Sequence, residues 1–215
     1  MKRRDFSLAL GAAAGASLVH TPALAQAKPP VAGTDYLVLE KPAPVEAPAG
    51  KIEIIEFFWY SCPHCNVFEP ALATWIKRAP KDVAVRRVPV AFRDDFVPQQ
   101  RLYYALEAMG LVEKLHGRVF TAIHAEKQSL NTAESIAAWV AKQGVDKAKF
   151  MEQFNSFAVA NKATKGTQLQ NAYKVEGVPA IGVAGRFYTD GTFAKNMDRA
   201  LVIAEFLAAE IRKKK

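Results

Sequence analysis

Apolar residues form one nearly continuous run early in the chain, over residues 52–60. A run of this kind is typical of a central β-strand that is covered on both faces. Directly behind it, Pro63 suits the first position of a helix, and apolar side chains then recur at helical spacing. These side chains are Val67, Phe68, Leu72, Trp75 and Ile76. The pattern therefore predicts a strand that turns into a helix at residues 61–63.

Further strands are expected on both sides of a long middle segment. Before that segment, short strands are predicted at residues 36–39 and 83–90. After it, residues 178–183 and 186–188 read as a strand pair that turns at residues 184–185. The two flanks must pair with each other if they are to complete one sheet.

The middle segment itself, residues 96–173, has a helical pattern of apolar positions. Its breaks, near residues 110, 128–132 and 144, indicate four or five helices. A further amphipathic helix is predicted over residues 197–214. The sequence therefore predicts an α/β fold, in which sheet segments flank a helical block.

Composition adds an export signal to this picture. Half of the 215 residues are apolar, which is enough for one sizeable core and a second small lobe. Residues 1–25 combine a basic start with a short apolar stretch and a small-residue end, the layout of a cleavable signal peptide. Because Arg3 and Arg4 are followed by Phe6, the general and the twin-arginine export routes both stay open. Either route leads out of the cytoplasm.

The positive charge of the chain is modest, with a formal net charge of +8. It is concentrated only at residues 213–215 and at Arg86 and Arg87, and we interpret these as solvated charge. We therefore expect no nucleic-acid partner.

The chain has two cysteines, Cys62 and Cys65, at the predicted strand-to-helix turn. An exported protein stabilised by disulfides usually has more cysteines, placed to close longer loops. Thiol-disulfide exchange needs a thiolate that attacks or leaves and a second sulfur that resolves the mixed disulfide. At a helix start Cys62 meets unpaired backbone N–H groups, whereas Cys65 lies one turn inside. We therefore assign Cys62 as the nucleophile and Cys65 as the resolving thiol.

The residues between the cysteines fit the same chemistry. Pro63 sets the first helical residue without wasting a hydrogen bond, and His64 places an imidazole N–H or a positive charge beside the Cys62 sulfur. A stabilised thiolate favours the reduced form, so the disulfide becomes a stronger oxidant. We expect no metal and no cofactor besides the Cys62–Cys65 disulfide.

Three other uses of the cysteine pair are weaker. A structural zinc site needs four ligands and would have to recruit His116 or His124 from the helical block. Attachment of a c-type haem needs a histidine directly after the second cysteine, where Asn66 stands. A purely structural disulfide would close a loop too small to stabilise the fold much.

Glu56 interrupts the buried strand six residues before Cys62. A carboxylate there is costly unless it is hydrogen-bonded or protonated, so Glu56 is a candidate proton relay to Cys65. The alternative is a charge at the strand end that reaches solvent or pairs with Lys51. The sequence leaves both open.

The segment Gly177-Val178-Pro179 is the third candidate functional element. In isolation it is a proline at a strand start, and a plain loop is the alternative. If the Val178–Pro179 bond is cis, the backbone of Val178 is exposed for pairing with an extended substrate peptide.

Together these motifs resemble the DsbA family, the protein-disulfide oxidants within the thioredoxin superfamily. The resemblance covers essentially all of the chain after the signal. It rests on Leu39-Glu40-Lys41-Pro42, Glu56-Phe57-Phe58, Cys62-Pro63-His64-Cys65, Phe68-Glu69 and Gly177-Val178-Pro179-Ala180. Proline and histidine between the cysteines, with a distant Gly-Val-Pro after a helical insertion, make the combination highly specific.

The resemblance implies a thioredoxin fold with an inserted all-helical domain. The expected parts are a signal peptide (1–25), the first thioredoxin-like part (26–94), the helical insertion (95–172) and the second thioredoxin-like part (173–215). It also implies that a cis Pro179 faces the cysteines and that Val178 and Pro179 bind substrate.

The resemblance also implies a role for the protein in the periplasm. There it would donate its disulfide to unfolded or partly folded exported proteins with free thiols. A DsbB-type membrane quinone reductase would then reoxidise it. An acidic thiol and a strongly oxidising couple are themselves known of DsbA, so they come with the resemblance. We expect a monomer.

Two other functions compete with disulfide donation. A reductase or isomerase would use the same chemistry, but Ser61 precedes Cys62 where reducing thioredoxins have a tryptophan. A non-catalytic peptide-binding chaperone would use only the groove beside Pro179, and changing Cys62 to serine would leave its function intact.

Overall fold

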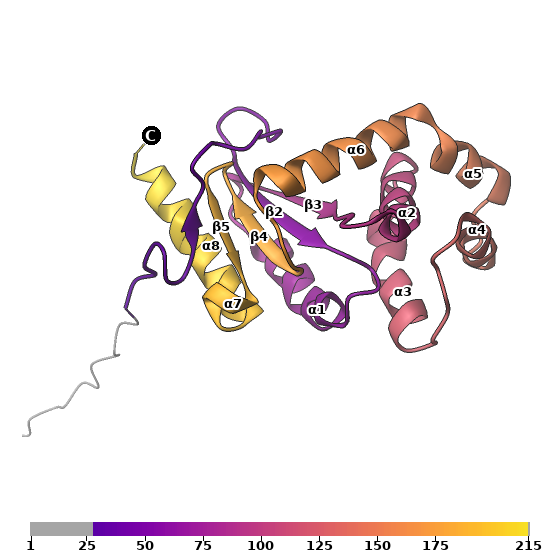
Figure 1. The fold of residues 1–215 in the computed structure, drawn as a ribbon, viewed down its shortest axis with the longest axis horizontal. Coiled ribbons are helices and arrows are strands. Elements are labelled where there is room, and N and C mark those ends of the chain that lie inside the picture. The colour runs from indigo at the N-terminus through magenta and orange to yellow at the C-terminus, as the bar shows by residue number, and fades with distance from the viewer. Residues whose placement is uncertain (1–27, 215) are drawn as a thin grey trace, which may run out of the picture.

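A five-stranded sheet forms the centre of the computed structural model, which describes residues 28–214 (Figure 1). The predicted signal peptide, residues 1–25, lies outside the described residues. The strands are β1 (Leu37–Val38), β2 (Ile52–Phe58), β3 (Val83–Pro89), β4 (Ala180–Val183) and β5 (Phe187–Asp190). They are ordered β1-β5-β4-β2-β3, with β2 parallel to β3 and antiparallel to β4. The flanks of the helical block thus complete one sheet, as predicted.

The helices divide into a block beside the sheet and a second group that packs on the sheet, formed by two long helices and one short one. The block, seen at the right of Figure 1, comprises α2 (Val97–Ala108), α3 (Val112–His124), α4 (Ala133–Lys142), α5 (Lys147–Asn155) and α6 (Phe157–Ala172), after a short 3-10 turn, η1 (Asp94–Phe96). Against the sheet lie α1 (Pro63–Arg78), α7 (Gly191–Ala194) and α8 (Met197–Arg212). The expected α/β class, a thioredoxin fold with a helical insertion, is confirmed.

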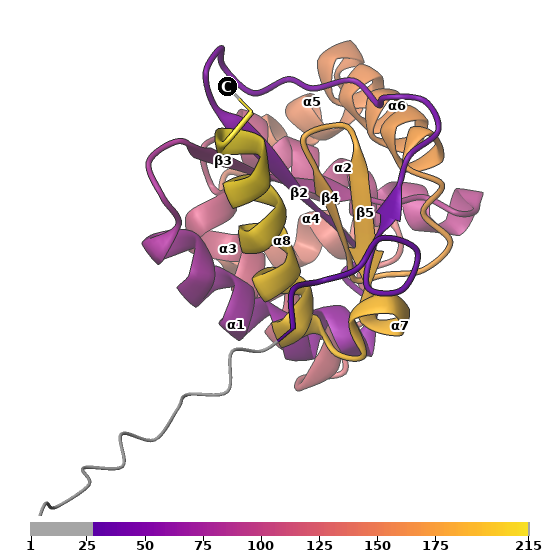
Figure 2. The same cartoon turned by 90° about the vertical axis from the view of Figure 1, so that its left-hand side faces the viewer.

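Strand β2 is buried along its whole length because helices cover both faces of the sheet. Its even-numbered residues Ile52 and Ile54 pack with α1 and α8, and Figure 2 shows α8 lying across this face. The odd-numbered Ile55 and Phe57 face the other way and pack with Leu169 of α6. This alternation is the two-residue period of a strand, and it places Glu56 on the α1 side.

The structure differs from the predictions in several places, and β4, for example, begins at Ala180 and not at residue 178. β2 ends at Phe58 and not at residue 60, because Trp59 turns away and its carbonyl accepts a hydrogen bond from the Cys62 N–H. The middle segment contains five helices, within the predicted four or five, but the break at Ser156 was not predicted. The Ser156 hydroxyl caps α6 by accepting from the Val159 N–H at 3.2 Å. The short helix α7 was not predicted. Among residues 28–214, no helix is long and apolar enough to cross a membrane.

Candidate active site

Cys62 is the N-cap of α1, at the turn that follows β2. Its backbone is extended, with φ −79° and ψ 118°, and Pro63 begins the helix. The N–H of Cys65 donates a hydrogen bond to the Cys62 Sγ at 3.4 Å, the bond that a serine hydroxyl accepts in an ordinary cap. Both cysteines are free thiols. The helix start therefore aims its unpaired amides at the first sulfur.

The two thiols differ sharply in acidity. The pKa of Cys62 is lowered to about 6, first by a hydrogen bond from the Cys65 thiol, then by the N–H groups of Cys65 and His64, and last by the charge of His64. Burial opposes this shift. The pKa of Cys65 is raised, first by burial and then by Cys62. Cys62 is thus the thiolate at neutral pH, and Cys65, which is fully buried, keeps its proton.

His64 has a smaller part in this acidity than the helix itself. Its side chain is exposed, and its charge acts in the predicted direction but contributes less than the backbone N–H groups do. The backbone N–H groups at the helix start, where Pro63 is the first residue, therefore lower the pKa of Cys62 more than the imidazole does.

The loop before β4 brings the predicted substrate-binding residues to Cys62. The Val178–Pro179 peptide bond is cis, and the Cys62 sulfur lies 3.3 Å from the Val178 carbonyl oxygen, to which it donates a hydrogen bond when it is protonated. A groove of about 770 Å³ opens beside this contact. Its walls include His64, Val67, Phe68, Val178, Pro179 and Met197. The predicted catalytic and peptide-binding residues therefore lie at one site.

Glu56 lies beneath the turn, 1% exposed, and pairs with Arg87 of β3. The Arg87 Nε donates to Glu56 Oε2 at 3.0 Å, and the other carboxylate oxygen, Oε1, is buried without a partner. Glu56 therefore neither reaches solvent nor pairs with Lys51, the alternative drawn from the sequence. Burial raises its pKa to about 8, against the opposing charge of Arg87.

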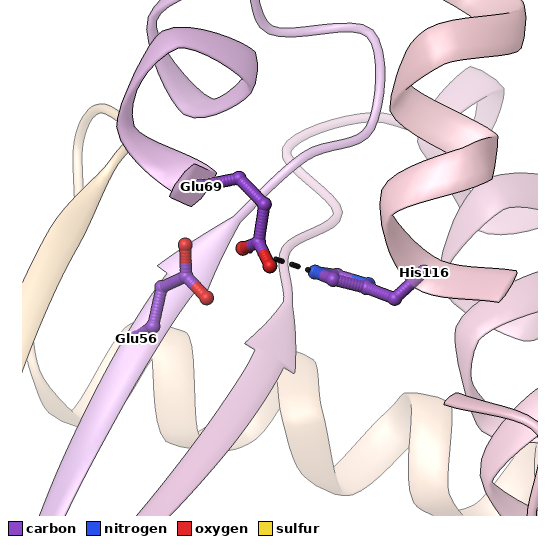
Figure 3. A group of neighbouring side chains, drawn as sticks. All are labelled: Glu56, Glu69 and His116. Carbon is purple, nitrogen blue, oxygen red and sulfur yellow. Dashed lines mark ion pairs between the residues drawn. The ribbon is translucent and has the colours of Figure 1, made fainter. Parts of the chain in front are cut away.

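Glu56 lies beside a second carboxylate, Glu69, and the imidazole of His116 (Figure 3). Arg87 joins the two carboxylates. Its Nη2 donates to both oxygens of Glu69, at 2.7 and 2.8 Å. Across Glu69 lies His116 of α3, whose Nε2 is 3.4 Å from Glu69 Oε2 but is not aligned for a hydrogen bond. Burial on its own raises the pKa of Glu69, but the contacts with His116 and Arg87 outweigh it and the pKa is lowered.

His116 is held neutral by the same surroundings. Burial lowers its pKa, and its Nδ1 lies 2.9 Å from the hydroxyl of Tyr60, whose pKa burial raises. Tyr60 therefore keeps its proton. The carboxylate of Glu69, which can only accept, lies 3.4 Å from Nε2 and favours the imidazole proton on that nitrogen, so we assign the Tyr60 hydroxyl as the donor to Nδ1.

Glu56, Glu69 and His116 hold possible metal-ligand atoms within 4.8 Å of one another. Arg87 already donates hydrogen bonds to both carboxylates, so the cluster supplies its own positive charge. The arrangement therefore fits a buried ion network better than a metal site.

The interpretation of Arg86 and Arg87 as solvated charge is wrong. Both lie within β3, and their side chains are 23% and 16% exposed. Because neighbouring strand residues point to opposite faces, Arg87 meets Glu56, whereas Arg86 pairs with Glu46 at 3.1 Å.

Sequence reasoning missed the side chains of the helical block that reach the turn before Cys62. Gln99 of α2 binds Ser61 through both ends of its amide, and His124 of α3 lies 2.8 Å from the Tyr60 carbonyl through Nε2. The sequence does show that Gln99 is a polar residue within a helical pattern of apolar positions. That signal does not indicate that its partner is Ser61, 38 residues away. His116 and His124, considered above as zinc ligands, instead contact Tyr60.

Comparison with known proteins extends the similarity over most of the chain. A family model described as "DSBA-like thioredoxin domain" matches residues 53–202. Thiol:disulfide interchange protein DsbA of Burkholderia cepacia is 43% identical over 210 residues, which span 97% of this chain and 95% of that protein. The protein of that name from Pseudomonas aeruginosa is 40% identical over 188 residues, spanning 87% and 89%. A crystal structure of Pseudomonas aeruginosa DsbA matches with a TM-score of 0.82 at 39% identity, covering 86% of this chain and 95% of that one.

Titration of the dithiol form tests the acidity of Cys62. Thiolate absorbance near 240 nm should rise with a midpoint at about pH 6. Cys65→Ala should move this midpoint upward, because it removes the largest stabilising hydrogen bond. His64→Ala, the control, should move it less. A wild-type midpoint near 9, the ordinary value for a thiol, would contradict the assignment.

Glu56 should make the stability of the protein depend on pH. Its pKa is about 8 in the folded chain against an ordinary value of 4.5, so the folded chain holds a proton that the unfolded chain releases between these values. This stabilisation is complete below pH 4.5 and is lost as pH rises to about 8. Glu56→Gln cannot titrate, so relative to wild type it should gain stability from pH 5 to pH 8, by at most about 1.4 kcal/mol per pH unit.

Urea unfolding at the two pH values measures this difference. Glu134→Gln, at an exposed acid in the first turn of α4, is the control and should follow wild type. Parallel profiles for wild type and Glu56→Gln would show that Glu56 does not take up a proton on folding.

Proposed function

The chain belongs to the family of DsbA-like thioredoxin domains, and from this membership and the geometry of the site we infer that it is a protein disulfide oxidase whose redox-active pair is Cys62 and Cys65. The observation that carries this function is the position of Cys62. It combines an acidic thiol at the start of α1 with the Val178 carbonyl at 3.3 Å, where a substrate backbone can pair. A nucleophile and a peptide-binding edge thus meet at one sulfur.

The reaction begins from the Cys62–Cys65 disulfide. A substrate thiolate attacks the Cys62 sulfur, a mixed disulfide forms, and Cys65 leaves with the electron pair of the broken bond. A second substrate thiolate then attacks the substrate sulfur of the mixed disulfide and releases Cys62 as a thiolate. The substrate loses two electrons and gains a disulfide, and the enzyme becomes the dithiol. Because the pKa of Cys62 is about 6, its thiolate is a good leaving group.

Cys65 must take up a proton when it leaves, because burial raises the pKa of its thiol. Glu56 is the proposed source. Its pKa of about 8 keeps it protonated at neutral pH, and once it has given up that proton its charge raises the pKa of the Cys65 thiol. On reoxidation Glu56 would take the proton back.

Substrates are proposed to be exported proteins with free thiols, bound as extended segments along Val178 and Pro179. The groove beside them is lined largely by apolar side chains, which suits unfolded segments of varied sequence. The export signal predicted in residues 1–25 supports the proposal that this activity is periplasmic. Since each turnover leaves the dithiol, an electron acceptor is required, and a DsbB-type membrane quinone reductase is the proposed partner.

The relay is tested by the reaction of the oxidised enzyme with glutathione. Glu56→Gln should slow formation of the mixed disulfide by roughly a hundredfold, the low end of general-acid effects. After correction for the thiolate fraction of glutathione, the wild-type rate should fall as pH passes 8, and the variant should show no such step. Equal rates and equal pH profiles in stopped-flow measurements would remove Glu56 from the mechanism.

The equilibrium with glutathione separates the oxidase from a reductase. Purified protein, equilibrated at a series of glutathione ratios, can be followed by the fluorescence of Trp59, which lies three residues before Cys62. We expect a potential near that of DsbA itself, about −120 mV, and far above the value of about −270 mV for thioredoxin. Cys62→Ser, which cannot form the pair, is the control and should show no transition. A potential near the thioredoxin value would favour the reductase.

A further inference from the structure

The helical block holds Ser61, the last of the three residues that connect β2 to Cys62. Gln99 of α2 accepts a hydrogen bond from the Ser61 N–H through Oε1 at 3.2 Å. Its Nε2 donates to the Ser61 hydroxyl at 2.7 Å and to the Leu130 carbonyl at 3.0 Å. Ser61 directly precedes the reactive cysteine, and Leu130 lies in the loop between α3 and α4. One side chain therefore ties the active-site turn to the insertion.

The orientation of the Gln99 amide follows from its partners. The side chain is 3% exposed, so water does not replace a lost bond. A flipped amide would place its NH₂ against the Ser61 N–H and its oxygen against the Leu130 carbonyl, two repulsive contacts. The oxygen and both hydrogens of the NH₂ group are engaged in the observed orientation, so Gln99 has one favourable arrangement.

The position of Ser61 matters because the sheet no longer restrains it. β2 ends at Phe58, and the last bond of that edge joins the Val90 N–H to the Phe58 carbonyl at 2.9 Å. Beyond it, the Cys62 N–H donates to the Trp59 carbonyl at 3.0 Å, and the Ser61 N–H depends on Gln99. The Cys65 N–H reaches the Cys62 sulfur at 3.4 Å, and because a hydrogen bond weakens when its donor and acceptor are misaligned, a rotation of the turn weakens this bond.

We propose that Gln99 is a positioning residue for disulfide exchange: it fixes the Ser61 peptide and thereby holds the Cys62 sulfur against the first amides of α1. The inference rests on the proposed function, since it concerns the same redox pair. It assigns part of the oxidising strength of the site to a side chain of the helical insertion, outside the thioredoxin part.

The neighbouring residue offers a matched control. Gln100 lies on the same helix, is 1% exposed and is likewise hydrogen-bonded. Its Nε2 donates to the Pro89 carbonyl at 2.9 Å and to Thr167 Oγ1 at 3.2 Å, and none of its hydrogen bonds in residues 28–214 involves the active-site turn. Loss of either amide leaves buried polar groups unpaired, but only Gln99 touches Ser61.

The experiment compares Gln99→Met with Gln100→Met in the full chain. Methionine keeps the length of the side chain and removes the hydrogen bonds. Thiolate titration near 240 nm and the glutathione equilibrium are measured for both variants. Gln99→Met should raise the pKa of Cys62 by about one unit and make the disulfide about tenfold less oxidising in its equilibrium constant. Gln100→Met should leave both the acid dissociation constant of Cys62 and the equilibrium constant with glutathione within about twofold of wild type. This should hold even if urea unfolding shows a similar loss of stability in the two variants.

Two results would overturn the proposal: a folded Gln99→Met protein with both values unchanged, or an equal shift in Gln100→Met. If Gln99→Met does not fold, Ser61→Ala serves instead, because it removes only the 2.7 Å bond. It should shift the titration in the same direction by a smaller amount, and an unchanged midpoint would count against Gln99. A wild-type potential near that of thioredoxin would reject the oxidase, whereas this inference depends only on the difference between variant and wild type.

Discussion

The stabilisation of one thiolate at the start of a helix is the interaction on which the rest of this structure depends. Cys62 obtains it from the amides of α1, and those amides are available only because the chain turns directly from a central strand into that helix. The sheet supplies a rigid strand on one side of the turn. The loop before β4 supplies the carbonyl of Val178 on the other. The strand β2, the helix α1 and the loop before β4 therefore all contribute to the environment of a single sulfur.

A charged network lies under this turn, and Arg87 is its centre. It holds Glu69 as a carboxylate by two hydrogen bonds but gives Glu56 only one, and Glu56 is also the more deeply buried of the two. The two acids therefore have opposite shifts, with the pKa of Glu56 raised and that of Glu69 lowered. Deeper burial of Glu56 and the contacts of Glu69 with His116 and Arg87 thus divide a pair of glutamates into a protonated member and an ionised member. Such a division is typical of sites that move protons.

The local parts of the site follow from the sequence, and the parts that join distant segments do not. The strand, the cap at Cys62 and the burial of Glu56 all depend on residues close to one another in the chain. The partner of Glu56 depends instead on the register of β2 and β3, which places Glu56 opposite Arg87. No pattern within either strand sets that register. The role of Gln99 is still harder to predict from the sequence, because its contact with Ser61 arises from the way the insertion packs on the sheet.

The contact between Cys62 and Val178 joins residues 116 positions apart. A polypeptide is made from its N-terminus onward, so both cysteines exist well before the strand that completes their site. During that interval β2 lacks its neighbour β4, and the two thiols belong to a chain that is not yet folded. A newly made copy is therefore itself an unfolded protein with free thiols, the kind of molecule that finished copies are proposed to oxidise.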